Sequence, residues 1–133
     1  MSLRPPGGTP PPATAQLGTC ELDLVVLARE ICERYHEHYP DEDDCYGPAG
    51  ADWCRHDNQW LLSWAVGDVL GVTSLDEQAS WLAGVLDSRG FPLDRLAHDL
   101  RIAADVVEAA AGEPGGAVGG SLRRAAVIVA PPD

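Results

Sequence analysis

The feature that most constrains the fold is an apolar repeat in the last third of the chain. Between residues 93 and 110, apolar side chains recur at alternating intervals of three and four residues, at Leu93, Leu96, Leu100, Ala103, Val107 and Ala110. This spacing places them on one face of an α-helix. Phe91 and Pro92 precede the repeat, and proline suits the start of a helix. The chain is therefore expected to contain an amphipathic helix whose apolar face needs a partner.

A second helix is predicted over residues 21–39, where the same spacing recurs at Val25, Ala28, Cys32, Tyr35 and Tyr39. Leu24, Leu27 and Ile31 widen this apolar face. Thr19 is expected to be the N-cap, and Pro40 is expected to stop the helix.

Two further helices are predicted between these. One begins at Pro48 and runs to about Leu70. The other starts with Ser74 and Glu77, which have the spacing of a capping box, and ends at Gly90, which favours a left-handed C-cap. Short connections between amphipathic helices favour antiparallel neighbours. The sequence therefore predicts an all-α domain, either a four-helix bundle or a globin-like helical domain.

Both ends of the chain are predicted to lie outside that domain. Residues 1–18 are rich in proline and glycine and are expected to be disordered. The helical domain is expected over 19–111, followed at 112–133 by a Gly-rich linker and a short apolar tail. Residues 125–130 have the composition of a strand. It could be the first strand of a truncated α/β domain, a strand added to a partner, or a poorly ordered tail, which we favour.

The charge of the chain limits its partners. The net charge is −12 and there is no lysine, so binding to nucleic acid or to an anionic membrane surface is not expected. No apolar run is long enough to cross a bilayer, and no signal peptide is recognised, so a cytoplasmic location with free thiols is expected. A core this small favours a homodimer or a protein partner.

The most unusual segment is the helix predicted over 48–70, where a carboxylate shares a face with several tryptophans. One hypothesis for this helix is a ligand-binding site formed by Cys54, His56, Asp57, Trp60 and Trp64. Asp57 should then pair with an arginine, a tryptophan N–H or a helix N-terminus, because an unpaired buried carboxylate is costly. The alternative is that Asp57 forms only a structural hydrogen bond. For a tetrapyrrole-like ligand, His56 is a better candidate than His98, which is expected to be exposed.

A zinc or copper site is a further alternative. Cys32 and His36 are one helical turn apart, and Cys54 would complete the set. Against this, Cys32 lies on an apolar face, where cysteine behaves as a small apolar residue. No catalytic motif is recognised, so the chain is not expected to be an enzyme.

Several short motifs resemble a helical module of bacterial sensory regulators, which often precedes a cobalamin-binding-type α/β domain. They are Tyr46-Gly47-x-x-Gly50, Cys54-x-x-Asp57, Trp81-Leu82 and Arg89-Gly90-Phe91-Pro92, and residues 124–132 are similar to the first strand of such a domain. The Cys-x-x-Asp motif also resembles globin-like and phycobiliprotein-like helices. The resemblance implies a regulatory or sensing role without catalysis. Cobalamin is not expected to bind this chain, because the α/β domain is not in it.

The sequence therefore favours a non-catalytic helical regulatory or protein-interaction module. A small-molecule sensor and a metal-binding protein remain as alternatives.

Overall fold

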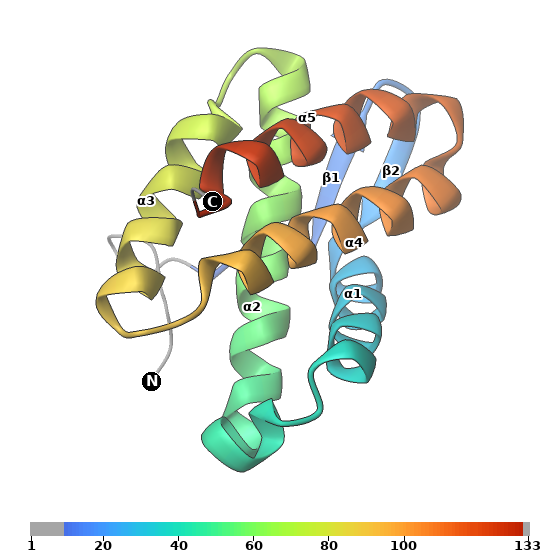
Figure 1. Cartoon of the computed structure of the whole chain (residues 1–133). Coiled ribbons are helices and arrows are strands. Elements are labelled where there is room, and N and C mark those ends of the chain that lie inside the picture. The colour runs from blue at the N-terminus through green and yellow to red at the C-terminus, as the bar shows by residue number, and fades with distance from the viewer. Residues whose placement is uncertain (1–9, 132–133) are drawn as a thin grey trace.

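The residues that the structure describes fold into five helices and a small hairpin (Figure 1). The computed structural model describes residues 10–131, with residues 43–46 as backbone only. The elements are β1 Thr14–Leu17, β2 Cys20–Asp23, α1 Leu24–His38, α2 Glu42–Leu70, α3 Leu75–Ser88, α4 Leu93–Ala111 and α5 Glu113–Val129. The mostly helical fold confirms the all-α prediction. The four-helix prediction is wrong, because the described residues form five helices and two strands.

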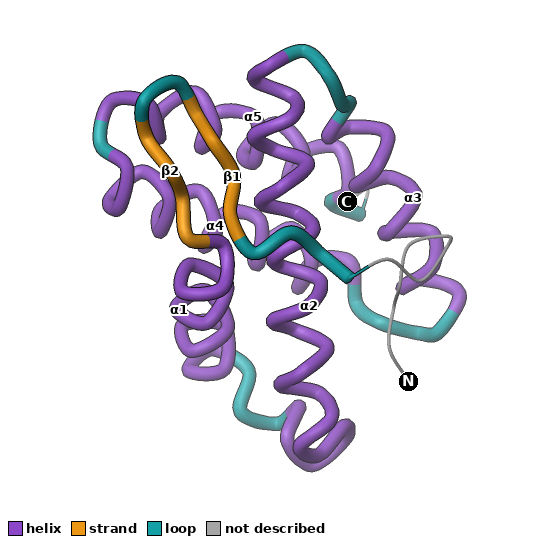
Figure 2. Tube along the Cα trace, turned by 180° about the vertical axis from the view of Figure 1, so that it is seen from behind, coloured by secondary structure: helices purple, strands orange, loops and turns teal. Residues whose placement is uncertain are grey.

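The hairpin occupies part of the segment predicted to be a disordered tail. Strands β1 and β2 are antiparallel, with Leu17 opposite Cys20, and they join through Gly18 at φ 63°. A two-residue turn with glycine at positive φ suits the twist of a hairpin. Leu17 and Leu22 are buried, and the hairpin lies beside α1 and α2 (Figure 2). The prediction of disorder is thus wrong for the hairpin, and residues 1–9 lie outside the described residues.

Helix α1 begins later than predicted because residues 20–23 form a strand. Its N-cap is Asp23, whose Oδ1 accepts a hydrogen bond from the Val26 N–H at 3.1 Å. The prediction of Thr19 as N-cap is therefore wrong. The buried face centres on Leu24, Leu27 and Ile31, the residues expected only to widen the apolar face.

The starts and ends of α2 and α3 follow the local signals in the sequence. Gly47, at φ 62° and ψ −157°, interrupts α2, so its regular part starts at Pro48 as predicted. Ser74 caps α3 by accepting a hydrogen bond from the Glu77 N–H. Beyond α3, Gly90 has the left-handed φ that its predicted role requires.

Helix α5 replaces the linker and loose tail predicted for residues 112–133. Gly112 turns the chain at φ 62°, and α5 returns antiparallel along α4 (Figure 1). Its glycines allow a close approach: a Cβ on Gly115 would lie 2.6 Å from the backbone oxygen of Val107. The prediction of a linker is wrong because residues 113–129 form a helix, in which Gly115 and Gly119 pack against α4. The predicted strand over 125–130 lies in α5 up to Val129.

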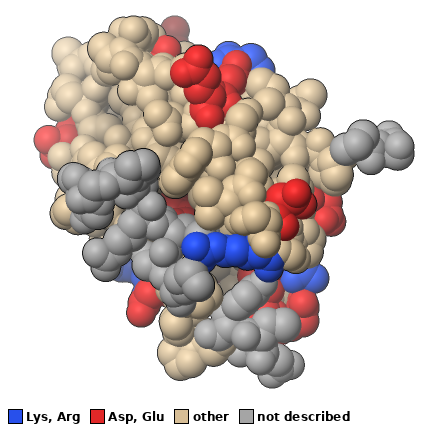
Figure 3. Space-filling model, turned by 90° about the vertical axis from the view of Figure 1, so that its left-hand side faces the viewer, with Lys and Arg blue, Asp and Glu red and all other residues tan. Residues whose placement is uncertain are grey.

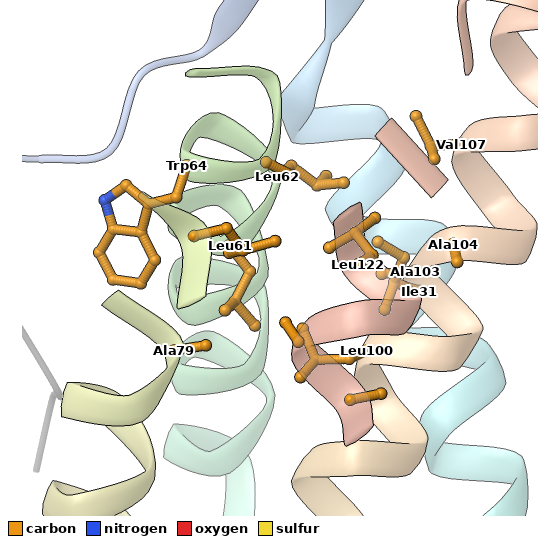
Figure 4. Packing of buried hydrophobic residues seen from close by; sticks show 14 of the residues in the cluster. Ile31, Leu61, Leu62, Trp64, Ala79, Leu100, Ala103, Ala104, Val107 and Leu122 are labelled. Atoms are coloured by element: carbon orange, nitrogen blue, oxygen red, sulfur yellow. The ribbon is translucent and has the colours of Figure 1, made fainter. Parts of the chain in front are cut away.

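All five helices contribute to one core (Figure 4). Completely buried side chains come from each of them, among them Ile31, Leu62, Ala79, Leu100 and Leu122. The interior therefore includes α5, and the folded unit extends beyond the range 19–111.

Charged side chains are dispersed on the molecular face in Figure 3. Acidic residues occur there in separate groups, with arginines between them and other residues making up most of the described surface. Within residues 10–131, no helix combines the length and apolar character needed to cross a membrane.

Candidate functional site

A half-open cavity of about 310 Å³ lies where α2, α3 and α4 meet, with one side chain from α1. Its walls are mainly apolar, with a few polar groups among them, which is the usual character of small-molecule sites. The lining residues are Tyr35, Glu42, Gly50, Trp53, Cys54, Asp57, Asn58, Leu61, Leu82, Leu86, Arg89, Phe91, Arg95, Leu96 and Asp99.

A buried amide–carboxyl pair forms one wall of this cavity. Asn58 and Asp99 are only 2% and 6% exposed. The Asn58 Nδ2 donates to Asp99 Oδ1 at 3.1 Å and to the backbone oxygen of Cys54 at 3.0 Å. Because the backbone oxygen of Cys54 can only accept, the amide orientation is fixed and Oδ1 is left as the remaining acceptor. That Oδ1 is buried and has no hydrogen-bond partner among the described residues.

The two carboxyls in the cavity hold their protons more tightly than ordinary aspartates. Burial raises the pKa of Asp57 to about 8, and the charge of Asp99 adds to the effect. Burial also raises the pKa of Asp99 to about 7; the hydrogen bond from Asn58 lowers it, and the charge of Glu42 raises it. Both groups are therefore partly protonated near neutral pH. In the described part of the chain, no arginine pairs with either of them.

Arg95, at the edge of the cavity, is neutralised by other acids. Its guanidinium lies 2.8 Å from Glu42 Oε2 and 3.1 Å from Asp41 Oδ2, and it stacks over the Tyr39 ring at 4.4 Å. The Tyr35 hydroxyl also donates to Glu42. Burial, followed by this bond, raises the pKa of Tyr35, so its hydroxyl stays protonated. These contacts hold the first turn of α2 against α1 and α4.

The structure brings together only part of the ligand site predicted from the sequence. Cys54 and Asp57 line the cavity, whereas His56 lies beside it, with Nδ1 3.3 Å from Asp57 Oδ1. The rings of Trp60 and Trp64 stack with their centroids 5.7 Å apart, and neither side chain lines the cavity. Trp64 is buried beside α3 (Figure 4). Asp57 therefore meets a histidine and a second aspartate instead of an arginine.

The residues predicted to bind a metal ion border a different cavity. Cys32, His36 and Cys54 are among the residues lining a hollow of about 400 Å³ between α1 and α2. The Asn58 Nδ2 lies 3.6 Å from the Cys32 sulfur and 3.5 Å from the Cys54 sulfur. A hydrogen bond with Cys32 and burial raise the pKa of Cys54, which disfavours the thiolate that metals bind. Among the described residues, no three His, Cys, Asp or Glu side chains are placed to hold a metal ion.

Two further polar residues, of which His98 was expected to be exposed, make tertiary contacts. His98 is half-buried, and its Nδ1 lies 2.6 Å from the Tyr39 hydroxyl. Asp68 accepts hydrogen bonds from the Leu75 N–H, the Ser121 hydroxyl and Arg124, so it links α2 to α3 and α5. Both side chains therefore help to hold helices together.

Asn58, Arg95 and Asp99 were missed as cavity residues. A signal existed for Asp99, because it interrupts the apolar face of α4, three residues after Leu96 and three before Ile102. Asn58 directly follows the predicted Asp57 but gave no signal of its own.

No family model, curated protein or solved structure matches the chain. The cavity therefore has to be interpreted from its own chemistry.

Proposed function

We propose that this chain is a non-catalytic regulatory domain that senses a small molecule bound between α2, α3 and α4. The observation that carries the proposal is the half-open apolar cavity itself, whose wall includes the buried polar side chains of Asn58 and Asp99. Interiors are normally close-packed, so unfilled space of this size beside buried polar groups is unusual. A ligand would supply the missing contacts.

The protonation state of the Cys54 thiol favours a ligand-binding role for the cavity over a role in nucleophilic catalysis. The thiol of Cys54 is the obvious nucleophile there, but its pKa is raised, whereas reactive thiols have lowered values. A volume of about 310 Å³ is near the lower end for ligand pockets, which favours a ligand smaller than a tetrapyrrole.

The signal would pass to a protein partner or to a second copy of the chain. Large apolar side chains are exposed on the helices around the core: Trp81 on α3, and Val127 and Ile128 on α5. Trp81, Val127 and Ile128 would supply the apolar contacts of such a surface. Ligand binding would stabilise the arrangement of α2, α3 and α4 and thereby the surface that a partner contacts.

The proposal is tested by screening small apolar amines, alcohols and acids against the full chain. Binding should raise the melting temperature and change the fluorescence of Trp53, which lines the cavity. Leu86→Phe, which fills the cavity, should abolish the response, whereas Leu70→Phe, at an exposed position, should leave it intact. Light scattering with and without ligand then shows whether occupancy changes association. The absence of any response in the wild-type chain would contradict the proposal.

A further inference from the structure

We infer that the ligand is an organic cation, a primary ammonium on a small apolar body, with its head against Asp57 and Asp99. This inference rests on the proposed function and specifies the chemistry of its ligand.

When Asp57 and Asp99 are ionised, hydrogen-bond acceptors outnumber donors at this wall of the cavity. Asp99 Oδ1 receives the Asn58 amide, and Asp57 Oδ1 has only a long contact, of 3.3 Å, with His56 Nδ1. An ammonium group carries three donors and no acceptor. It therefore supplies the group that the wall lacks.

The charges around the cavity also favour a cation. The ionisable groups that line it are Tyr35 of α1; Glu42, Cys54 and Asp57 of α2; Arg89 after α3; and Arg95 and Asp99 of α4. Arg95 is already paired with Glu42 and Asp41. Asp57 and Asp99 have no arginine partner in the described structure, and the whole chain carries −12. Such a field attracts cations and repels anions.

The remaining walls suit an apolar body. Leu82 and Leu86 of α3, Trp53 of α2 and Phe91 also line the cavity. Burying an apolar group against these side chains is favourable. A polyamine with charges along its length would place further ammonium groups against these side chains without acceptors, so one charged end is favoured.

Binding of an ammonium should release protons. Near neutral pH the two aspartates are partly protonated, since their pKa values are about 8 and about 7. A cation beside them favours the ionised forms, so the affinity should rise between pH 6 and pH 8.5. This coupling distinguishes pairing with a carboxylate from simple apolar burial.

The test is calorimetric titration of the full chain with 2-phenylethylamine, 2-phenylethanol and phenylacetate at pH 8. The amine should bind at least about ten-fold more tightly than the alcohol, and phenylacetate most weakly. The heat should vary with the ionisation enthalpy of the buffer, which shows proton release. Asp57→Asn and Asp99→Asn should each weaken amine binding about ten-fold and leave alcohol binding nearly unchanged. Asp87→Asn, at an exposed position, is the matched control.

The outcomes separate the inference from the proposed function. Equal or tighter binding of the alcohol or of phenylacetate would overturn the cationic ligand and leave a ligand-binding cavity standing. The inference of a cationic ligand would also be overturned if the amine bound without proton release and with the same affinity in the Asp57→Asn variant. If nothing in the wider screen binds the wild-type chain, the proposed function fails and the inference fails with it.

Discussion

At the scale of single residues, Asp99 is the most informative position. It stands on the buried face of α4 between Leu96 and Ile102, where an apolar residue would pack without cost. Its hydrogen-bond partner is the neutral amide of Asn58. A neutral partner offsets little of the cost of burying a charge, so the carboxyl remains protonated to about pH 7. Asp99 thus makes the cavity polar at the expense of stability.

This cost predicts how stability depends on pH. An acid whose pKa is higher in the folded than in the unfolded chain binds more protons when folded. It leaves stability unaffected below the unfolded pKa and lowers stability as pH rises from the unfolded to the folded pKa, above which the loss is complete. With values of about 7 and about 8 for Asp99 and Asp57, and about 3.9 for an unfolded aspartate, this loss should accumulate between about pH 4 and pH 8. Denaturant unfolding at several pH values measures this loss of unfolding free energy.

Asp99→Asn isolates the contribution of this carboxyl. We expect the variant to exceed wild type in unfolding free energy by at least about 1 kcal/mol at pH 8, and the difference to vanish near pH 4. The lowered pKa of His98 opposes the loss, because protonation of a buried histidine destabilises the folded chain below its unfolded pKa. That effect is common to wild type and variant and cancels in the difference. Asp87→Asn should show no such trend, and an Asp99→Asn difference independent of pH would contradict the assignment.

At the scale of elements, the contact between α4 and α5 depends on small residues. Gly115 is buried, and a Cβ there would lie 2.6 Å from the backbone oxygen of Val107 and 3.0 Å from the Ala111 Cβ. Neither neighbour is the flexible end of a side chain, so the helices would have to separate. Gly120, on the exposed side of α5, has no such neighbour.

These two glycines give opposite predictions for the same substitution. Gly115→Ala should lower the unfolding free energy by about 1–3 kcal/mol because it forces α5 away from α4. Gly120→Ala should raise it by about 0.5–1 kcal/mol, because alanine has the higher helix propensity. Thermal and denaturant unfolding of both variants measures the contrast. Equal effects of the two changes would mean that α5 does not pack on α4 in this way.

At the scale of the whole molecule, the sequence predicted the elements whose signals are local. The repeat in α4, the cap at Ser74 and the turn at Gly90 depend on neighbouring residues, and all three are confirmed. Helix α5 was missed because its glycines lower helix propensity, and only contact with α4 explains them. Its buried face does have helical spacing, at Val118, Leu122, Ala125 and Val129, and this signal was overlooked.

The candidate site was predicted only where it lies within one segment. Cys54 and Asp57 are on one helix and could be proposed together, whereas Asp99 lies 41 residues after Asn58. Such a pair forms only when α2 and α4 pack, which no local pattern encodes. The tryptophans misled the prediction because Trp60 and Trp64 share a helical face with each other but not with the cavity.

Substitutions in α5 test whether this C-terminal helix belongs to the same core as the other helices. Leu122 is completely buried among the other helices, whereas Val127, on the same helix, is 78% exposed. Leu122→Ala should cost about 2–5 kcal/mol of unfolding free energy, and Val127→Ala less than about 0.5 kcal/mol. A loose tail would give small effects for both. Because Arg124, two residues after Leu122, also reaches Asp68 and Asp76, displacement of α5 would disturb α2 and α3 together. The Leu122→Ala chain should therefore still unfold in a single transition at lower denaturant, and a separate early transition would show that α5 is a unit of its own.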